Sequence, residues 1–441
     1  MTCSIEFACP TKGEHFVKVD FADIGTPGGT CGAYTVDANC HGVAATTNAV
    51  VGKLCLGKSN CSVAPNTNVL NPVNPNICDG VVKRTAIQLT CGTGPPQPPP
   101  PAPSPPAPTP TSNATKCTGP FGADLPALLQ NRPSGTKVPD FMVMAAPFTA
   151  FHANGSINTA APLPLAKLFK QRLGITAVWV MGMRGQFDTL TVAERKQVAT
   201  AWVLAGKATG LFTIIQCGST STAEAAEVAA YVESIGGDAV ASVGPFEELC
   251  SSTECVVDWV APVAAAAPNT PFFYYHTPGW NGKSINGVKM YDWFKYAATK
   301  IPTNVGVKFE SYDDAEFRQT CGEYGEQKVM IYAPCNSLGH WSQGTPGRGA
   351  FIQAWAGPMC NRIRAAYEKG DTAQMTKEVG FMKDCDNAGG NFVERYFYGG
   401  YGVPGANFGP SRAPQPVETA ASLASMNATL HKCGFWEQHW P

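Results

Sequence analysis

The sequence carries little charge of either sign. Its 441 residues include 32 Lys and Arg against 33 Asp and Glu, which leaves a net charge of −1 and only 15% charged residues. A protein that binds nucleic acid or an anionic membrane through charge needs a basic surface. We therefore exclude DNA and RNA as partners.

Long apolar runs are also lacking. No uncharged apolar stretch approaches the roughly 18 residues of a transmembrane candidate, although 44% hydrophobic residues are typical of a globular chain. The opening residues MTCSIEFACP have neither the basic nor the apolar region of a signal peptide. We expect a soluble protein without a membrane span, in a mature form whose leader is missing.

Cysteine, in contrast, is abundant and unevenly distributed. Eight of the 17 cysteines fall within the first 91 residues. No Cys-x2-Cys pair marks a zinc site among these eight, so a disulfide framework is favoured over a metal site. Such a framework indicates an oxidising compartment and hence a secreted or cell-surface protein. Because the total is odd, at least one thiol is unpaired or bonded to another chain.

A proline-rich segment divides the chain. Residues 94–110 read GPPQPPPPAPSPPAPTP, which cannot pack a core and favours an extended polyproline II rod. A ligand for an SH3-like partner is the poorer alternative outside the cell. We predict a small all-β or mixed module over residues 1–92, a linker over 93–116 and a large domain over 117–441.

Asn-x-Ser/Thr triplets fit N-glycosylation of a secreted protein. Such triplets also arise by chance. They begin at Asn60, Asn113, Asn154 and Asn427.

From about residue 141, short apolar stretches alternate with amphipathic segments. Eight stretches have the length and spacing of strands in βα units: FMVMAA, AVWVMG, FTIIQC, AVASVGPF, PFFYYH, VGVKF, KVMIYAP and AFIQAW. This rhythm favours a closed (β/α)8 barrel, the TIM-barrel fold, over an open doubly wound sheet. Capping boxes at 191–194 and 221–224 mark two helix starts.

One predicted strand carries a lysine among apolar residues. Alternation along V-G-V-K-F-E places Lys308 and Glu310 on one face and the apolar residues on the other. In a barrel the apolar face meets the helices, so Lys308 would point into the lumen. Desolvation there lowers a lysine pKa towards the range where the neutral amine acts as a Schiff-base nucleophile. The alternative is a lysine exposed at a strand end.

The preceding predicted strand, in PFFYYHTPGW, offers a phenol. Alternation turns either Tyr274 or Tyr275 inward, near the strand end where barrel active sites form. An inward phenol could relay a proton, whereas a core or interface tyrosine is the plainer interpretation.

Several segments of the large domain match a known pattern. APFTAFHANGSIN, TLTVAERKQVATAWV, APNTPFFYYHTPGW, IPTNVGVKF and FGPSRAP resemble the N-acetylneuraminate lyase branch of the dihydrodipicolinate synthase family, class I aldolases on a (β/α)8 barrel. The resemblance covers about residues 141–436 and implies that Lys308 is the Schiff-base lysine and Tyr275 the catalytic tyrosine.

The resemblance implies retro-aldol cleavage of a 2-oxo acid. Lys308 would attack the keto carbon, and Tyr275 would take the proton of the C4 hydroxyl as the C3–C4 bond breaks. The products would be pyruvate and an aldehyde sugar, with no metal or dissociable cofactor. The family barrel is commonly tetrameric, so a homo-oligomer is possible.

The chain departs from the family at several positions expected to bind substrate. The carboxylate-binding loop, usually Gly-(Ser/Thr)-Thr-Gly-Glu, is here Gly-Met-Arg-Gly-Gln, with Arg184 either replacing the lost hydroxyls or facing solvent. The second relay tyrosine is absent from Pro-Phe-Glu, and a hydroxyl-bearing strand becomes Gly-Ala-Phe-Ile. The substrate-binding candidates are Gly182, Met183, Arg184, Glu247 and Gly349.

The N-terminal module resembles a second family. VDFADIGTPGGTCGAY, NCHG, AVVGKLCLGKSNCSV and KRTAIQLTC look like the galactose/rhamnose-binding lectin module of egg lectins, which implies a carbohydrate ligand. The family's Gly-Asp-Pro-Cys is replaced by Pro-Asn-Ile-Cys, so a ligand-contacting acid is missing. The implied disulfides are Cys3–Cys31, Cys9–Cys91, Cys40–Cys78 and Cys55–Cys61.

Two functions of different classes follow. The leading hypothesis is a secreted lectin-bearing lyase that acts on a sialic-acid-like 2-oxo acid. The alternative is an extracellular lectin or matrix protein whose degenerate barrel serves as a scaffold. A third interpretation keeps the aldolase chemistry with a less hydroxylated 2-oxo acid.

Overall fold

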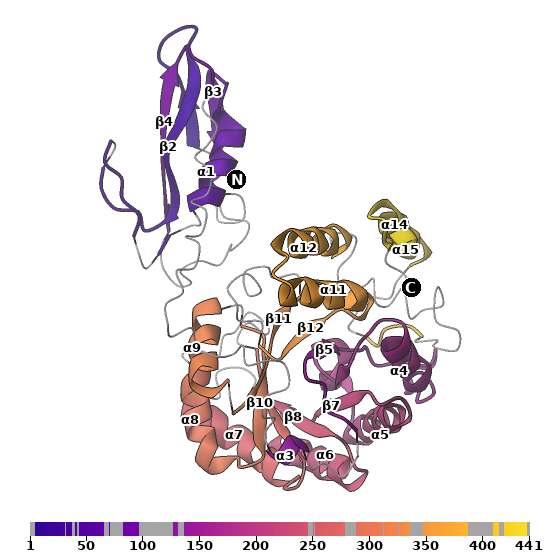
Figure 1. Cartoon of the computed structure of the whole chain (residues 1–441). Helices are drawn as coiled ribbons and strands as arrows, with labels where there is room; N and C mark the ends of the chain where they lie inside the picture. The colour runs from indigo at the N-terminus through magenta and orange to yellow at the C-terminus, as the bar shows by residue number, and fades with distance from the viewer. Residues whose placement is uncertain are drawn as a thin grey trace. The chain divides into compact units, whose positions relative to one another are not determined.

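The chain folds into two compact units, residues 1–112 and 113–441 (Figure 1). The division falls within the predicted linker. The computed structural model describes residues 5–30, 32–37, 40–41, 44–65, 70, 83–96, 127–130, 136–245, 250, 252–277, 288–311, 313–325, 327–335, 347–386, 409–413 and 419–438.

The N-terminal unit is a small mixed module. Strands β2 (His15–Gly25) and β4 (Arg84–Gly92) form an antiparallel pair, and β1 (Ile5–Ala8) pairs antiparallel with β3 (Asn60–Val63). Helix α1 (Ala44–Cys55) packs against β2 and β3. Apolar side chains from β2, β3 and α1 make one small core.

Disulfides close the N-terminal unit. The structure contains the bonds Cys9–Cys91 and Cys55–Cys61, two of the pairings that the lectin resemblance implies. Cys40 is also disulfide-bonded. The remaining cysteines of the implied set lie outside the described residues: Cys3, Cys31 and Cys78.

The second unit is the predicted barrel. Its strands close in the order β10-β11-β12-β5-β6-β7-β8-β9, each parallel to its neighbours. The strands are β5 (Met142–Ala145), β6 (Ala177–Val180), β7 (Phe212–Gln216), β8 (Ala239–Val243), β9 (Phe272–His276), β10 (Asn304–Phe309), β11 (Val329–Pro334) and β12 (Gly349–Ile352). The eight apolar stretches of the sequence thus predicted the strands correctly.

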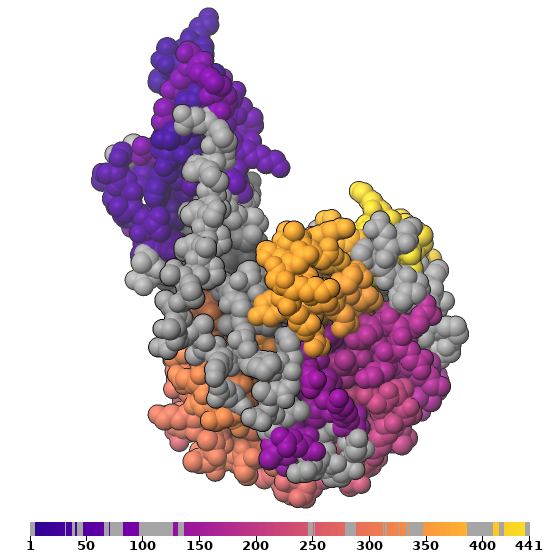
Figure 2. All heavy atoms as spheres, in the orientation of Figure 1, coloured from indigo at the N-terminus to yellow at the C-terminus, as the bar shows by residue number. Residues whose placement is uncertain are grey.

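Helices surround the barrel (Figure 1). They include α4 (Pro162–Gln171), α5 (Val192–Thr209), α6 (Thr222–Ser234), α7 (Thr253–Ala265), α8 (Met290–Lys300), α9 (Asp314–Tyr324) and α11 (Gly357–Glu368). Further helices of this unit are α3 (Ala127–Gln130), α12 (Thr372–Asp386), α14 (Ala420–Lys432) and α15 (Phe435–Gln438). Helices α11 and α12 pack side by side and form one continuous surface in Figure 2. No helix in the described part of the chain is long and apolar enough to cross a bilayer.

Both predicted capping residues begin their helices, but only the capping box at Thr191 is complete. The Thr191 hydroxyl accepts from the Glu194 N–H, and the Glu194 carboxylate accepts from the Thr191 N–H, which completes a capping box before α5. The Ser221 hydroxyl accepts from the Glu224 N–H before α6. These bonds satisfy backbone donors that have no partner within the first helical turn.

The C-terminal segment docks onto the start of α5. Arg412 donates to both carboxylate oxygens of Glu194 and to the carbonyls of Gly155 and Thr189, and its guanidinium lies over the Phe151 ring. The segment therefore ties the capping box of α5 to the loop that follows β5.

The barrel unit has disulfides of its own, and among its described residues Cys217 is a buried free thiol. The odd cysteine total had predicted such a thiol. The disulfides include Cys250–Cys255, Cys335–Cys360 and Cys385–Cys433, and Cys321 is also disulfide-bonded.

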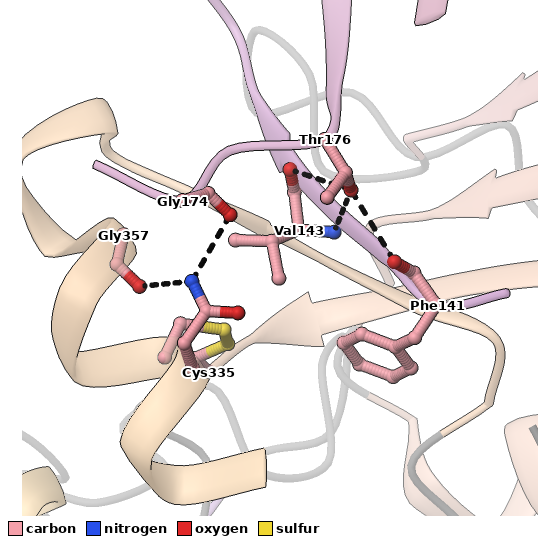
Figure 3. Close-up of a disulfide and its surroundings, with 8 residues drawn as sticks. Phe141, Val143, Gly174, Thr176, Cys335 and Gly357 are labelled. Atoms are coloured by element: carbon pink, nitrogen blue, oxygen red, sulfur yellow. Dashed lines mark hydrogen bonds between the residues drawn. A yellow bond between two sulfur atoms is a disulfide. The ribbon is translucent and has the colours of Figure 1, made fainter. Parts of the chain in front are cut away.

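The Cys335–Cys360 bond joins the end of β11 to α11 (Figure 3). Beside it, Asn361 Nδ2 donates to the carbonyls of Gly174 and Gly357 at 3.0 and 2.9 Å. Gly174 has a φ of +63°, which strains any other residue, and a Cβ there would lie 2.5 Å from Asn361 Nδ2, so a side chain would displace the Asn361 amide. These bonds fix α11 against the loop between α4 and β6.

Candidate active site

Strand β10 places a lysine at the centre of the barrel. Lys308 is only 3% exposed, which rules out a strand-end lysine that reaches solvent. The next residue, Phe309, points the other way and meets Phe317 of α9, with the ring centroids 5.5 Å apart. The alternation predicted for this strand is therefore the one observed.

Strand β9 separates its two tyrosines in the same way. Tyr275 points inward, with its ring centroid 5.2 Å from that of Trp179 on β6. Tyr274 points outward and stacks on Trp293 of α8 at 4.4 Å. Because β9 and β10 pair with Tyr275 directly opposite Lys308, the two side chains extend into the lumen together.

Three polar side chains meet at this point of the lumen. Lys308 Nζ donates to Tyr275 Oη at 3.1 Å and to Glu310 Oε2 at 3.1 Å. Tyr275 Oη donates to the same Glu310 oxygen at 2.6 Å. One carboxylate oxygen thus accepts from both the amine and the phenol.

Aromatic rings surround the amine. Lys308 Nζ lies 4.2 Å from the ring centroid of Tyr275, 4.7 Å from that of Phe351 on β12 and 5.5 Å from that of Trp179. Such faces stabilise a cation but exclude the water that would otherwise hydrate it. Phe351 lies on the strand that usually carries hydroxyl side chains in the family the chain resembles.

Burial sets the protonation of the lysine. Removal from water lowers the pKa of Lys308, and the nearby positive charge of Arg184 lowers it further. The Glu310 carboxylate opposes both effects, and the net pKa remains below the ordinary value. The amine therefore has a larger neutral fraction near pH 7 than an exposed lysine would have.

The loop after β6 holds three of the predicted substrate-binding residues. Arg184 lies in a short 3-10 helix, η1 (Met183–Gly185), close enough for its charge to act on Lys308. The Met183 side chain is 44% exposed and faces solvent. A Cβ at Gly182 would lie 3.1 Å from the Trp179 ring, so a larger residue there would crowd the ring.

The last two predicted positions differ in what the structure describes. Gly349 begins β12 on the same strand face as Phe351, and a Cβ there would lie 2.9 Å from Met142 Cβ. Its lack of a side chain lets β12 and β5 approach. Glu247 lies outside the described residues.

Glu310 was not among the residues predicted for the site. The alternation that pointed to Lys308 also places Glu310, two residues later, on the same strand face. That spacing of two residues was the feature of the sequence that could have predicted Glu310 as a site residue. A glutamate just past the strand end more often faces solvent, and only the closed barrel shows that its carboxylate bends back to Lys308 and Tyr275.

The predicted glycosylation sites lie in different settings. Asn154 is exposed in the loop after β5, and Asn60 is exposed in β3. Asn427 lies in α14, where its Oδ1 accepts from Trp436 Nε1 at 3.0 Å. Asn113 lies outside the described residues. Within the described ranges, no three His, Cys, Asp or Glu side chains converge as a metal site.

Comparison with known proteins agrees with both units. Residues 7–91 match the family model of the D-galactoside/L-rhamnose binding SUEL lectin domain. Residues 141–379 match the Dihydrodipicolinate synthetase family, whose class I aldolases use a lysine Schiff base without a metal or cofactor.

Similar curated proteins include animal N-acetylneuraminate lyases. The chain is 29% identical to N-acetylneuraminate lyase A of Xenopus laevis over 282 residues, which are 62% of this chain and 89% of that protein. It is 28% identical to the Homo sapiens N-acetylneuraminate lyase over 305 residues, 66% and 92% of the two chains.

A solved structure shares the barrel. The Proteus mirabilis N-acetylneuraminate lyase is 27% identical with a TM-score of 0.60, covering 67% of this chain and 99% of that one. The family match extends over more than half of the sequence and includes β10 with its buried Lys308. The chain therefore belongs to the dihydrodipicolinate synthetase family.

Proposed function

We propose that the barrel is a class I, Schiff-base lyase that cleaves a sialic-acid-like 2-oxo acid to pyruvate and an aldehyde sugar. The observation that carries this proposal is the buried Lys308 amine, 3.1 Å from the Tyr275 hydroxyl. A desolvated amine is the nucleophile that imine formation requires, and a phenol at that distance can exchange protons with a bound substrate.

In the proposed reaction, Lys308 Nζ attacks the keto carbon and water leaves, which produces an iminium. The C3–C4 bond then breaks, its electron pair forms the C2–C3 double bond of an enamine as the C=N π pair moves to nitrogen, and Tyr275 relays the C4 hydroxyl proton away. Protonation of the resulting enamine at C3 and attack by water release pyruvate and the free lysine. No step requires an oxidant or a metal.

The substrate class rests on the relatives and on one residue of the site. N-acetylneuraminate lyases are named for a 2-oxo acid sugar. Arg184 is close enough for its charge to act on Lys308, and a guanidinium can pair with a substrate carboxylate through two hydrogen bonds. The Phe351 ring beside Lys308 favours a substrate with fewer hydroxyls on that side.

Pyruvate with borohydride tests the proposal directly. The reducing agent converts the imine to a stable amine, and peptide mass spectrometry then locates the added mass on Lys308. Lys308→Ala is the control and should remove the adduct. Wild-type protein left unmodified at millimolar pyruvate would instead support the scaffold alternative.

We propose a second function for the N-terminal unit, the binding of galactose- or rhamnose-type sugars outside the cell. The SUEL lectin match over residues 7–91 and the Cys9–Cys91 and Cys55–Cys61 disulfides support it. The exposed loop site Asn154 would then carry an N-glycan. Retention of the full chain on immobilised galactose or rhamnose, with elution by the free sugar, tests the binding, and passage without retention would contradict it.

A further inference from the structure

Glu310 is placed where the chemistry of a lysine nucleophile needs a base. Its Oε2 lies 3.1 Å from Lys308 Nζ and 2.6 Å from Tyr275 Oη. The Lys308 side chain is 4% exposed and that of Glu310 20%. The Glu310 carboxylate thus contacts the buried amine while its side chain remains partly accessible to solvent.

A lysine ammonium cannot attack a carbonyl until it loses a proton. The groups that face Nζ come from several strands: Tyr275 from β9, Arg184 from the loop after β6, Glu310 from the end of β10, and the rings of Trp179 and Phe351 from β6 and β12. A guanidinium and an aromatic ring accept no proton.

Tyr275 is also unsuited to accept that first proton. Its hydroxyl hydrogen is donated to Glu310, and a neutral phenol is a far weaker base than a carboxylate or an amine. Of the groups that contact Nζ in the described part of the chain, the Glu310 carboxylate is therefore the one able to take a proton from the ammonium.

We propose that Glu310 is the acid–base residue of this site, accepting the Lys308 proton before imine formation and the Tyr275 proton during bond cleavage. The inference rests on the proposed lyase function and names the proton acceptor that this function needs. Glu310 contacts the reacting nitrogen itself, so its role is catalytic.

The protons balance at every step. Glu310 takes one from Lys308, and the neutral amine adds to the keto carbon. The protonated Glu310 then donates to the departing hydroxyl, which leaves as water and produces the iminium beside a carboxylate. During cleavage, the C4 hydroxyl proton moves to Tyr275 while the Tyr275 proton moves to Glu310, and the C3–C4 electron pair forms the neutral enamine. The same protons return when the enamine is protonated at C3.

Under this scheme Glu310 is negative whenever the nitrogen is positive and neutral whenever the nitrogen is neutral. The net charge of the buried site stays constant. An isolated charge in a desolvated site costs far more than a paired one, so this coupling keeps high-energy charge states out of the reaction path.

A counter-ion role is the competing explanation, and it predicts the opposite result. The Glu310 carboxylate favours the charged form of Lys308. If that were its whole contribution, Glu310→Gln would increase the neutral amine and imine formation would be as fast or faster. If Glu310 is the base, the same variant must be slower.

The experiment measures the rate of borohydride-trapped adduct formation with pyruvate between pH 6 and 9. We expect Glu310→Gln to be slower by about 100-fold at pH 7, the usual contribution of a general base. Glu310→Asp, which keeps a carboxylate, should recover part of the rate. Glu310→Ala with added formate should recover part of it as well, because formate fits the space of the missing carboxylate.

Glu227→Gln is the matched control and should react like wild type. Glu227 of α6 also pairs with a lysine, Lys196 of α5, at 2.7 Å, but on the exterior of the barrel. Trapping by Glu310→Gln at or above the wild-type rate, in protein with a native circular dichroism spectrum, would overturn the proposal. Absence of trapping in wild type would instead overturn the lyase function, which separates the two failures.

Discussion

Neighbouring groups act on the pKa of Lys308 in opposite directions. Burial and Arg184 lower its pKa, while Glu310 raises it. The aromatic faces of Trp179, Tyr275 and Phe351 keep water away from the amine. A residue that is ordinarily a surface cation thereby becomes a buried amine with a carboxylate and a phenol as its polar partners.

Tyr275→Phe isolates the phenol from the rest of the site. We expect cleavage of N-acetylneuraminate to slow by roughly 10²- to 10⁴-fold, the usual contribution of general acid–base catalysis, because no hydroxyl remains to take the C4 proton. Pyruvate trapping on Lys308 should persist, since imine formation does not use that proton transfer. The fold should also persist, because the ring that packs on Trp179 is retained. Unchanged turnover would remove Tyr275 from the mechanism.

Arg184→Met tests the loop after β6. Removing the guanidinium should weaken the apparent affinity for pyruvate in the trapping assay by at least about tenfold, because the carboxylate loses a charged partner. Arg184 also lowers the pKa of Lys308, so its loss raises that pKa. The pH at which trapping is half-maximal should therefore move upward.

Arg184→Lys is the control for this variant. It keeps a positive charge but not the paired donors of a guanidinium. Arg184→Lys should therefore keep the wild-type pH profile of trapping but should still weaken the apparent affinity for pyruvate. Equal affinity in wild type and Arg184→Met would show that another group receives the carboxylate.

At the scale of elements, the strands could be predicted because each is a short apolar stretch of strand length, spaced along the chain as in βα units. Alternation turned Lys308 into the lumen but left Tyr274 and Tyr275 as alternatives, between which the family resemblance selected Tyr275. The Thr191 hydroxyl located the start of α5. Glu310 was missed because alternation cannot tell an inward-bent carboxylate from one in solvent. Helix α1 was also not predicted, since AATTNAVVGKLC has no clear apolar stripe.

The contact between the C-terminal segment and α5 is a further element that sequence could not reveal. Arg412 and Glu194 are 218 residues apart, and no local rule pairs them. The Arg412 hydrogen bonds lower the pKa of Glu194 to about 2. Only the fold brings a C-terminal arginine to the capping box of a helix near the middle of the chain.

Arg412→Met should destabilise the barrel by about 1–2 kcal/mol at pH 7, allowing for the partial exposure of the pair. The folded-state pKa of Glu194 lies below its unfolded value. The stabilisation is therefore complete above pH about 4.5 and is lost as the pH falls towards 2. The free energies of unfolding of wild type and variant in urea should differ most near neutrality and less in acid, where the contacts of Arg412 with Gly155, Thr189 and Phe151 remain. Arg412→Lys should lose less, and an equal difference at every pH would contradict the assignment to Glu194.

At the scale of the whole molecule, the two units depend on different sources of stability. The barrel has a large apolar core that continues from the strands to the surrounding helices. The N-terminal unit has a much smaller core between β2, β3 and α1. Small units with little buried surface rely on cross-links to offset the entropy of the unfolded chain.

The disulfides differ accordingly in how much chain they close. Cys9–Cys91 spans 82 residues, whereas Cys250–Cys255 of the barrel spans five. By loop-closure entropy the first bond contributes about 4–5 kcal/mol and the second about 2 kcal/mol. The larger contribution approaches the whole stability of a small domain.

Reduction should therefore unfold residues 1–92 while the barrel stays folded. Hydrogen exchange followed by mass spectrometry in dithiothreitol should show loss of protection in β2 and β4 peptides before β6 and β10 peptides. The paired variant Cys9→Ala/Cys91→Ala should reproduce that loss without reductant, because the longest loop is then open in the unfolded chain. Cys250→Ala/Cys255→Ala is the matched control. It should leave the barrel folded, because the apolar core of the barrel contributes far more stability than a disulfide that closes so short a loop. Simultaneous loss of protection in both units, or earlier loss in the barrel, would show that the barrel depends on its disulfides as strongly as the N-terminal unit does.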